Sequence, residues 1–222
     1  MNTDVVGPIA IDGDAASGKT TAARTLARRY GFRLLDTGRM YRAFTLAALR
    51  AGVPATDTAA CEALANRIDL MVLPSPEETR VMLDGVDVSA ELDSRPVEDY
   101  VSGYSKVAGV RAVMVAMQRT LAADGRVVVV GRDIGTVVLP EAPAKLFLVA
   151  SAEVQARRRA SQHGLEFAVA QDNVNHRNAT DRGRATSPTT RAQDALEVDT
   201  SEATEGEVAQ TVLDYVRERL GR

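Results

Sequence analysis

The chain has 222 residues, of which 45% are hydrophobic and 26% charged, so it can bury one good core with room for a small inserted lobe. Its formal net charge of −3 argues against a general nucleic-acid or membrane-surface binder, because such proteins carry a basic excess. One cysteine, Cys61, and two separated histidines exclude an intrachain disulfide and disfavour a structural zinc site.

The apolar runs are far shorter than the roughly 18 residues that span a bilayer. The N-terminal stretch carries Asp4 and lacks the basic-then-apolar pattern of a secretory signal. We therefore expect a cytoplasmic protein with no membrane or nucleic-acid partner.

Apolar runs alternate with helical patterns along most of the chain. Strands are predicted at 5–11, 32–35, 127–130, 145–150 and 195–201, and helices at 18–30, 40–50, 152–162 and about 204–220. Strands that read as continuous apolar runs, separated by helices, indicate a parallel sheet. The predicted fold class is α/β.

One region breaks this alternation. Residues 68–88 hold β-rich runs, a Pro-containing turn and the pair Asp84-Gly85, which together are typical of a hairpin. An antiparallel hairpin inside a parallel pattern predicts an inserted subdomain at about 64–104. The core then comprises residues 1–63 and 105–222.

The segment "GDAASGKT" (13–20) fits the pattern G-x-x-x-x-G-K-[ST] and lies between a predicted strand and a predicted helix. Glycines and small side chains let backbone N–H groups approach a polyphosphate, and the helix N-terminus adds partial positive charge. Lys19 can reach the β- and γ-phosphates, and the Thr20 hydroxyl can ligate magnesium. The alternative, a chance glycine-rich turn, fits four fixed positions in this context poorly.

Asp14 lies inside this loop. A carboxylate beside a triphosphate is electrostatically unfavourable unless it points away. Because Asp tolerates unusual backbone angles, we expect Asp14 to be a solvent-facing turn residue.

Three further clusters are rich in phosphate-binding residue types. They are "LLDTGRMYR" (34–42), with Thr37 as the expected helix N-cap, "VVVVGRDIGTVVLP" (127–140) and "HRNATDRGRATSP" (176–188). The second cluster ends a strand at the carboxyl edge, where α/β sheets bind ligands. Each cluster alone could be a solvated face or a set of ion pairs. Beside the 13–20 loop, they predict a second phosphate site.

With these segments, "GRDIGTVVLPEAPAKLFLVAS" and "DALEVDTS", the chain resembles the bacterial cytidylate kinases nearly end to end. The resemblance implies a P-loop NTPase-type five-stranded parallel core flanked by helices, a nucleoside-monophosphate-binding insert and an Arg-rich lid near 157–184. The implied reaction transfers phosphate from ATP to CMP or dCMP with Mg²⁺. A monomer is expected.

The resemblance also implies residue roles. Lys19, Arg132 and Arg177 would be catalytic, and Thr20 would contact the metal. The ATP side would comprise Gly13, Asp14, Ala15, Ala16, Ser17, Gly18, Lys19, Thr20, Thr21, Arg158 and Arg159. The CMP side would comprise Thr37, Arg42, Ser105, Arg111, Arg132, Asp133, Arg177, Asp181 and Arg184.

The sequence departs from the resembled pattern at five points. Asp14 replaces a usual Pro, Val130 a common acid, Gln155 a common Arg and Asn178 a usual Asp. Losing the acid at 130 puts its role near magnesium in doubt, and Asp12 is a candidate for contact with the metal through water. The stretch from Ser105 to Arg111 is about three residues shorter than the resemblance leads us to expect.

Asp133 admits three roles. A carboxylate there could accept the N4 amino group of cytosine, bind magnesium, or pair with a neighbouring arginine. Two other functions also stay open. One is a kinase for another small acceptor, such as UMP or a non-nucleotide alcohol. The other is a regulatory nucleotide-binding switch, although the guanine-reading N/T-K-x-D pattern is absent.

Overall fold

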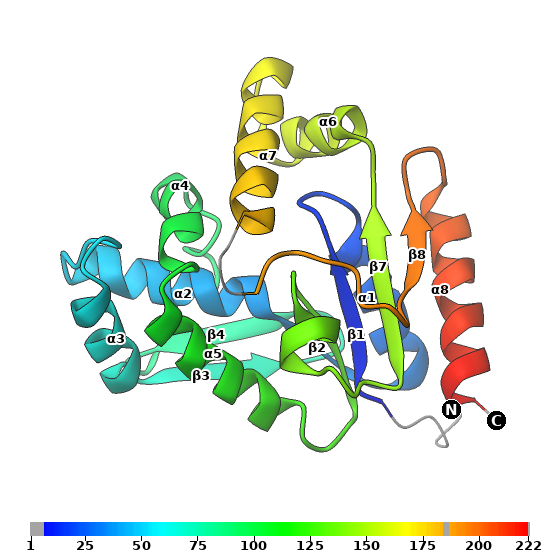
Figure 1. Ribbon diagram of the computed structural model, residues 1–222, viewed down its shortest axis with the longest axis horizontal. Helices are drawn as coiled ribbons and strands as arrows, with labels where there is room; N and C mark the ends of the chain where they lie inside the picture. The colour runs from blue at the N-terminus through cyan, green and yellow to red at the C-terminus, as the bar shows by residue number, and fades with distance from the viewer. Residues whose placement is uncertain (1–6, 184–186, 222) are drawn as a thin grey trace.

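The computed structural model describes residues 7–183 and 187–221 (Figure 1). A five-stranded parallel sheet in the order β2-β6-β1-β7-β8 lies at its centre, which confirms the predicted fold class. All residues of β1 and β6 are buried, as expected for central strands covered on both faces. The strands are β1 (Ile9–Gly13), β2 (Arg33–Asp36), β6 (Val127–Val130), β7 (Ala144–Val149) and β8 (Leu196–Asp199).

Helices cover both faces of this sheet. Helices α1 (Lys19–Tyr30) and α8 (Glu205–Leu220) share one apolar cluster, in which Leu26 and Val212 are fully buried. A second cluster involves α2 (Thr37–Arg50) and α5 (Ala108–Leu121), and it continues into the 58–104 region through residues such as Phe44 and Leu92. The described part of the chain thus has two apolar cores, one on each side of the sheet.

The predicted hairpin is confirmed as a small antiparallel sheet. It contains β3 (Leu70–Pro74), β4 (Thr79–Leu83) and β5 (Val86–Asp87), and it is flanked by α3 (Thr58–Arg67) and α4 (Arg95–Tyr104). Asp84 and Gly85 connect β4 to β5 with φ values of 49° and 78°, the left-handed pair that a tight hairpin turn requires.

The small sheet is attached to the edge of the large one. Leu34 of β2 donates its N–H to the carbonyl of Ser75 at 2.8 Å. The Thr79 hydroxyl donates to the carbonyl of Leu34 at 2.7 Å and accepts the N–H of Asp36 at 2.8 Å. The 75–79 segment therefore lies along the outer side of β2.

Two helices stand above the carboxyl ends of the strands, α6 (Ala152–His163) and α7 (Phe167–Arg182) (Figure 1). Ser151 caps α6 by accepting the N–H of Val154, and Gly164 ends it in the left-handed region at φ 62°. A short π-helix, η1 (Ile134–Val138), follows β6. Within the described ranges, no helix is long and apolar enough to cross a membrane.

Candidate active site

The 13–20 loop joins β1 to α1 in a conformation that explains its glycines. Gly13 and Gly18 have φ values of 141° and 86°, and a Cβ atom on Gly13 would collide with the carbonyl oxygen of Leu148 in β7. Gly18 is also the N-cap of α1. The loop therefore turns tightly and presents the N-terminus of α1 to a ligand.

Lys19 is buried against the loop. Its Nζ donates to the carbonyl of Asp14 and to Ser17 Oγ, the latter at 3.3 Å. Burial lowers the pKa of Lys19 well below its usual value, and the neighbouring Arg132 and Arg177 lower it further. A phosphate beside Lys19 would counter both effects, so this environment favours an anionic ligand.

Asp14 does not face solvent, so that prediction is wrong. Its side chain is only 5% exposed and pairs with Arg182 of α7 at 2.5 Å. The carboxylate points toward a cation on α7, which compensates for its position in the phosphate loop.

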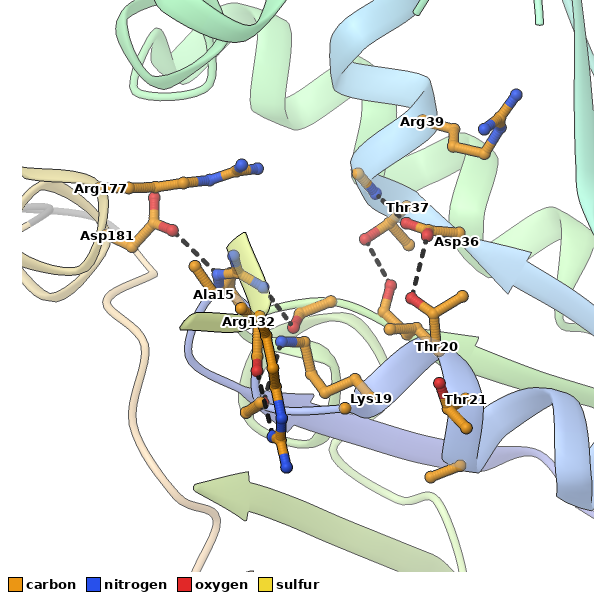
Figure 2. Close-up of a pocket in the computed structure, with 18 of the residues that line it drawn as sticks. Ala15, Lys19, Thr20, Thr21, Asp36, Thr37, Arg39, Arg132, Arg177 and Asp181 are labelled. Atoms are coloured by element: carbon orange, nitrogen blue, oxygen red, sulfur yellow. Dashed lines mark hydrogen bonds and ion pairs between the residues drawn. The ribbon is translucent and has the colours of Figure 1, made fainter. Parts of the chain in front are cut away.

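The start of α2 also differs from the prediction. Asp36, not Thr37, is the N-cap, and its side chain accepts the N–H of Gly38 at 2.9 Å. Thr37 begins the helix and donates its hydroxyl to the carbonyl of Val130 at 2.8 Å. The exchange brings the Asp36 carboxylate to 3.5 Å from Thr20 Oγ1, next to the phosphate loop (Figure 2).

A single open cavity of about 690 Å³ joins the loop to the three clusters. Arg132, Arg177 and Asp181 lie on one side of Lys19, and Thr20 and Asp36 lie on the other (Figure 2). Gly13 and Asp14 support the cavity without lining it, and Arg184 lies outside the described residues. The predicted residues that line it are Ala15, Ala16, Ser17, Gly18, Lys19, Thr20, Thr21, Thr37, Arg42, Ser105, Arg111, Arg132, Asp133, Arg158, Arg177 and Asp181.

Two ion pairs form part of the cavity wall. Arg111 and Asp133 pair with side chains that are 5% and 6% exposed. Arg132 Nε donates to Asp181 Oδ2 at 2.9 Å, which links the end of β6 to α7. The Asp133 pairing realises one of the three roles left open above, and it leaves a carboxylate and a guanidinium together at the cavity surface.

A third ionic cluster lies behind the cavity, centred on Glu98 of α4. Its carboxylate, 8% exposed, contacts Arg42 at 2.6 Å, Arg177 at 3.5 Å, and Arg159. Burial alone would raise the pKa of Glu98, but Arg42, Arg177 and Arg159 together lower it to about 2. Arg159 therefore lies on the Arg42 side of the site, whereas Arg158 contacts the loop at the carbonyl of Ala16.

Three of the positions that depart from the resembled pattern, Asp14, Gln155 and Asn178, lie close together. The N–H of Ala15 donates to Asn178 Oδ1 at 3.1 Å, and Asn178 Nδ2 donates to Gln155 Oε1 at 2.7 Å. With the pair of Asp14 and Arg182, they connect the phosphate loop to α6 and α7. Val130 is buried and offers no ligand atom.

Sequence reasoning missed several residues of the site. Asp36 was not predicted because Thr37 was expected to be the helix cap. Glu98 belongs to no sequence motif. Ser102 lines the cavity three residues before Ser105, which matches the three-residue shortfall between Ser105 and Arg111. Arg39 also lines the cavity and donates to the carbonyl of Ser89 at 2.8 Å.

Magnesium fits one place in this site. Thr20 Oγ1 and the Asp36 carboxylate are hard oxygen donors at the edge of the loop, the ligand type that Mg²⁺ prefers. Each carboxylate oxygen of Asp12 already accepts one backbone N–H, from Ile134 and Gly135 at 2.7 Å, so a contact of Asp12 with the metal through water would use the remaining lone pairs. Burial raises the pKa of Asp12 to about 6. Residues 7–183 and 187–221 hold no group of three His, Cys, Asp or Glu that could bind a metal without a substrate.

The chain is similar to known proteins over nearly its whole length. The chain is 45% identical over 226 residues to the cytidylate kinase of Nocardia farcinica (strain IFM 10152), with 99% of this chain and 97% of that protein covered. It is 42% identical over 218 residues to the cytidylate kinase of Geobacillus thermodenitrificans (strain NG80-2), covering 96% and 97%.

Among solved structures, an uncharacterized protein from Eubacterium ventriosum ATCC 27560 shares the fold, with a TM-score of 0.52 and 13% identity over 95% of this chain and 98% of that one. The family model for cytidylate kinase matches residues 9–218. The chain belongs to the cytidylate kinase family.

Proposed function

We propose that the protein transfers the γ-phosphate of ATP to CMP and dCMP, producing CDP or dCDP and ADP. One observation carries the proposal. A single cavity joins the phosphate loop, the arginines Arg42, Arg132 and Arg177, and the buried pair of Arg111 and Asp133. These three parts suit a phosphate donor, an acceptor phosphate and a polar base edge.

The donor side is the 13–20 loop. Its backbone N–H groups and Lys19 bind the ATP phosphates, and Arg158 supports the loop through its contacts with Ala16 and Thr200. Thr20 and Asp36 would hold Mg²⁺, and the ion would neutralise phosphate charge there. Gly13 and Asp14 act by shaping the loop rather than by contact with ATP.

The acceptor side is a set of guanidinium groups that bind phosphate bidentately. Arg42 and Arg132 bind the acceptor phosphate, beside Thr37. Burial, Arg132 and Arg42 lower the pKa of Arg177 to about 9, so an anion between these groups would be strongly stabilised. We place the base between Asp133, Arg111 and either Ser102 or Ser105, with Asp181 toward the sugar.

The reaction requires little covalent chemistry from the protein. An oxygen of the acceptor phosphate forms a bond to the γ-phosphorus while the bond from that phosphorus to the β,γ-bridging oxygen breaks and ADP leaves. The acceptor oxygen is already anionic at neutral pH, so no general base is needed. Lys19, Arg132 and Arg177 stabilise the charge that spreads over the transferred group.

The proposed reaction also gives roles to the small inserted segment and to the helices above the sheet. The 64–104 segment is the nucleoside-monophosphate-binding insert, and the helices α6 and α7 belong to the lid at about 157–184. Closure of the lid excludes water, so that the acceptor phosphate and not hydroxide attacks. A monomer contains every residue named above.

A coupled ADP-release assay with CMP, dCMP, UMP, AMP and shikimate tests the proposal. We expect turnover with CMP and dCMP to exceed turnover with the other acceptors. Faster turnover with UMP or shikimate would assign a different acceptor, and ATP hydrolysis without any acceptor dependence would favour a switch protein.

A further inference from the structure

A relay of three hydrogen bonds connects the phosphate loop to the end of β7 through two neutral amide side chains. Ala15 N–H donates to Asn178 Oδ1, Asn178 Nδ2 donates to Gln155 Oε1, and Gln155 Nε2 donates to the carbonyl of Ala150. The three distances are 3.1, 2.7 and 2.6 Å. Gln155 is buried and Asn178 is half-buried, so the Gln155 end of the relay is partly shielded from competing water.

Chemistry at the two ends fixes the direction of the relay. Ala15 N–H can only donate, so Asn178 must present its oxygen there and its amino group to Gln155. The carbonyl of Ala150 can only accept, so Gln155 must present its amino group there and its oxygen to Asn178. The two requirements agree, and each amide has one favoured orientation.

The relay lies on the same face of α7 as the Asp14 contact. Asn178 and Arg182 are four residues apart, so they project from one side of the helix. They contact the consecutive loop residues Ala15 and Asp14. This face seats α7 on the phosphate loop at two adjacent points.

Arg177 is the residue before Asn178, and its guanidinium extends across the cavity (Figure 2). Because Asn178 is held against the loop, the backbone of the preceding residue, Arg177, is held there as well. We infer that Asn178, held by Gln155, is a positioning residue for phosphoryl transfer. Asn178 sets the position of Arg177 relative to the phosphates bound by the loop. The catalytic part of this inference rests on the proposed function.

The relay does this without adding charge beside the triphosphate. A carboxylate at position 178 could still accept the N–H of Ala15. It could not donate to Gln155, and it would repel the bound phosphates. The electrostatic penalty would disappear if position 155 carried a guanidinium, because an Arg–Asp pair provides the same donor-to-acceptor link.

The test uses Asn178→Asp, Gln155→Arg and the double variant. Asn175→Asp is the matched control, because Asn175 is exposed on the same helix and the substitution changes the charge equally. kcat and the KM values for ATP and CMP are measured for each protein. The affinity for the fluorescent analogue mant-ATP is measured without an acceptor.

We expect Asn178→Asp to raise KM for ATP about tenfold and to lower kcat about tenfold. Each of these changes corresponds to the free energy of one charge-assisted hydrogen bond or less. KM for CMP should stay within about twofold. Gln155→Arg alone should lower kcat because it buries an unpaired charge. The double variant should recover to within about threefold of the wild type in both parameters.

Two results overturn the inference. One is an Asn178→Asp protein that matches Asn175→Asp in kcat and in mant-ATP affinity. The other is a double variant in which the two single losses simply multiply. If the wild-type protein shows no turnover with CMP, the proposed function fails by itself, and the mant-ATP affinities still decide whether the relay seats the lid helix on the loop.

Discussion

Asp133 pairs with Arg111 in a setting where neither side chain is more than 6% exposed. The pair joins the end of β6 to α5, and its polar atoms lie at the wall of the cavity. A buried carboxylate beside a guanidinium presents both an acceptor and donors, which is the pattern that the cytosine edge requires. We propose that the ion pair orients the carboxylate for base reading.

Asp133→Asn tests base reading. The variant removes the carboxylate that accepts the cytosine N4 amino group and offers an amide that can donate to uracil O4. We expect kcat/KM for CMP to fall by about 5- to 150-fold, the range of 1–3 kcal/mol for such a contact, while UMP turnover is unchanged or rises. Kinetics with both acceptors measure this ratio.

Two outcomes point elsewhere. Equal losses for CMP and UMP with a higher magnesium requirement would assign Asp133 to the metal. Equal losses with a lower unfolding temperature and unchanged magnesium dependence would make it a structural partner of Arg111, because breaking a buried pair costs about 3–5 kcal/mol.

Lys19→Ala removes the cation that the loop holds beside the β- and γ-phosphates. We expect turnover to be abolished while CMP binding and the unfolding temperature stay close to those of the wild type. Burial already destabilises the charged form of Lys19, so its loss should not weaken the fold. The exposed Lys106→Ala variant serves as the control in the same ADP-release assay. Near-normal turnover by Lys19→Ala would refute the role of the loop.

Thr20→Ala and Asp36→Asn test the magnesium site. Each variant removes one hard oxygen donor, so we expect the magnesium concentration for half-maximal activity to rise about tenfold. Asp36→Asn retains an oxygen that can accept the N–H of Gly38, which limits the effect on the α2 cap. Thr120→Ala, an exposed helical threonine, should leave the titration unchanged. If the two site variants also leave it unchanged, the metal is held elsewhere.

The lowered pKa of Glu98 predicts that the folded protein loses stability as the pH falls. Its pKa is lowered from 4.5 to about 2 in the folded protein, so the stabilisation is complete above pH 4.5 and is lost as the pH falls toward 2. We expect the free energy of unfolding of the wild type to exceed that of Glu98→Gln at neutral pH. This difference should shrink by about 3 kcal/mol between those pH values.

Urea unfolding at several pH values measures the difference. The control is Glu91→Gln, because Glu91 pairs with Arg50 at the exposed surface and should show a small, nearly constant difference. A difference for Glu98→Gln that stays constant down to pH 2 would contradict the assigned cause.

Much of this architecture could be predicted from the sequence because its signals are local. Buried strands such as Val127–Val130 are continuous apolar runs, and Asp84-Gly85 specifies its own turn. The phosphate loop is equally local. The predicted residues of the cavity meet because parallel strands end at one edge of the sheet.

The errors and omissions arise from contacts between distant segments. Asp14 was predicted to face solvent because its partner, Arg182, is 168 residues away. Glu98 contacts Arg42, Arg159 and Arg177, which are 56, 61 and 79 residues away, and no local pattern marks a carboxylate that several arginines share. The Thr37 prediction failed because two adjacent residues can both cap a helix, and only tertiary packing selects one.

The attachment of Ser75 and Thr79 to β2 has a consequence for solubility. A strand at the margin of a sheet normally leaves a row of backbone donors and acceptors free to recruit a strand from another molecule. Here Ser75 and Thr79 occupy the N–H and carbonyl of Leu34 and the N–H of Asp36. Thr79→Val would remove the hydroxyl from two of these contacts, and the freed groups would favour self-association through strand pairing at high protein concentration. The segment that helps to hold the small sheet in place therefore also protects the large sheet from intermolecular growth.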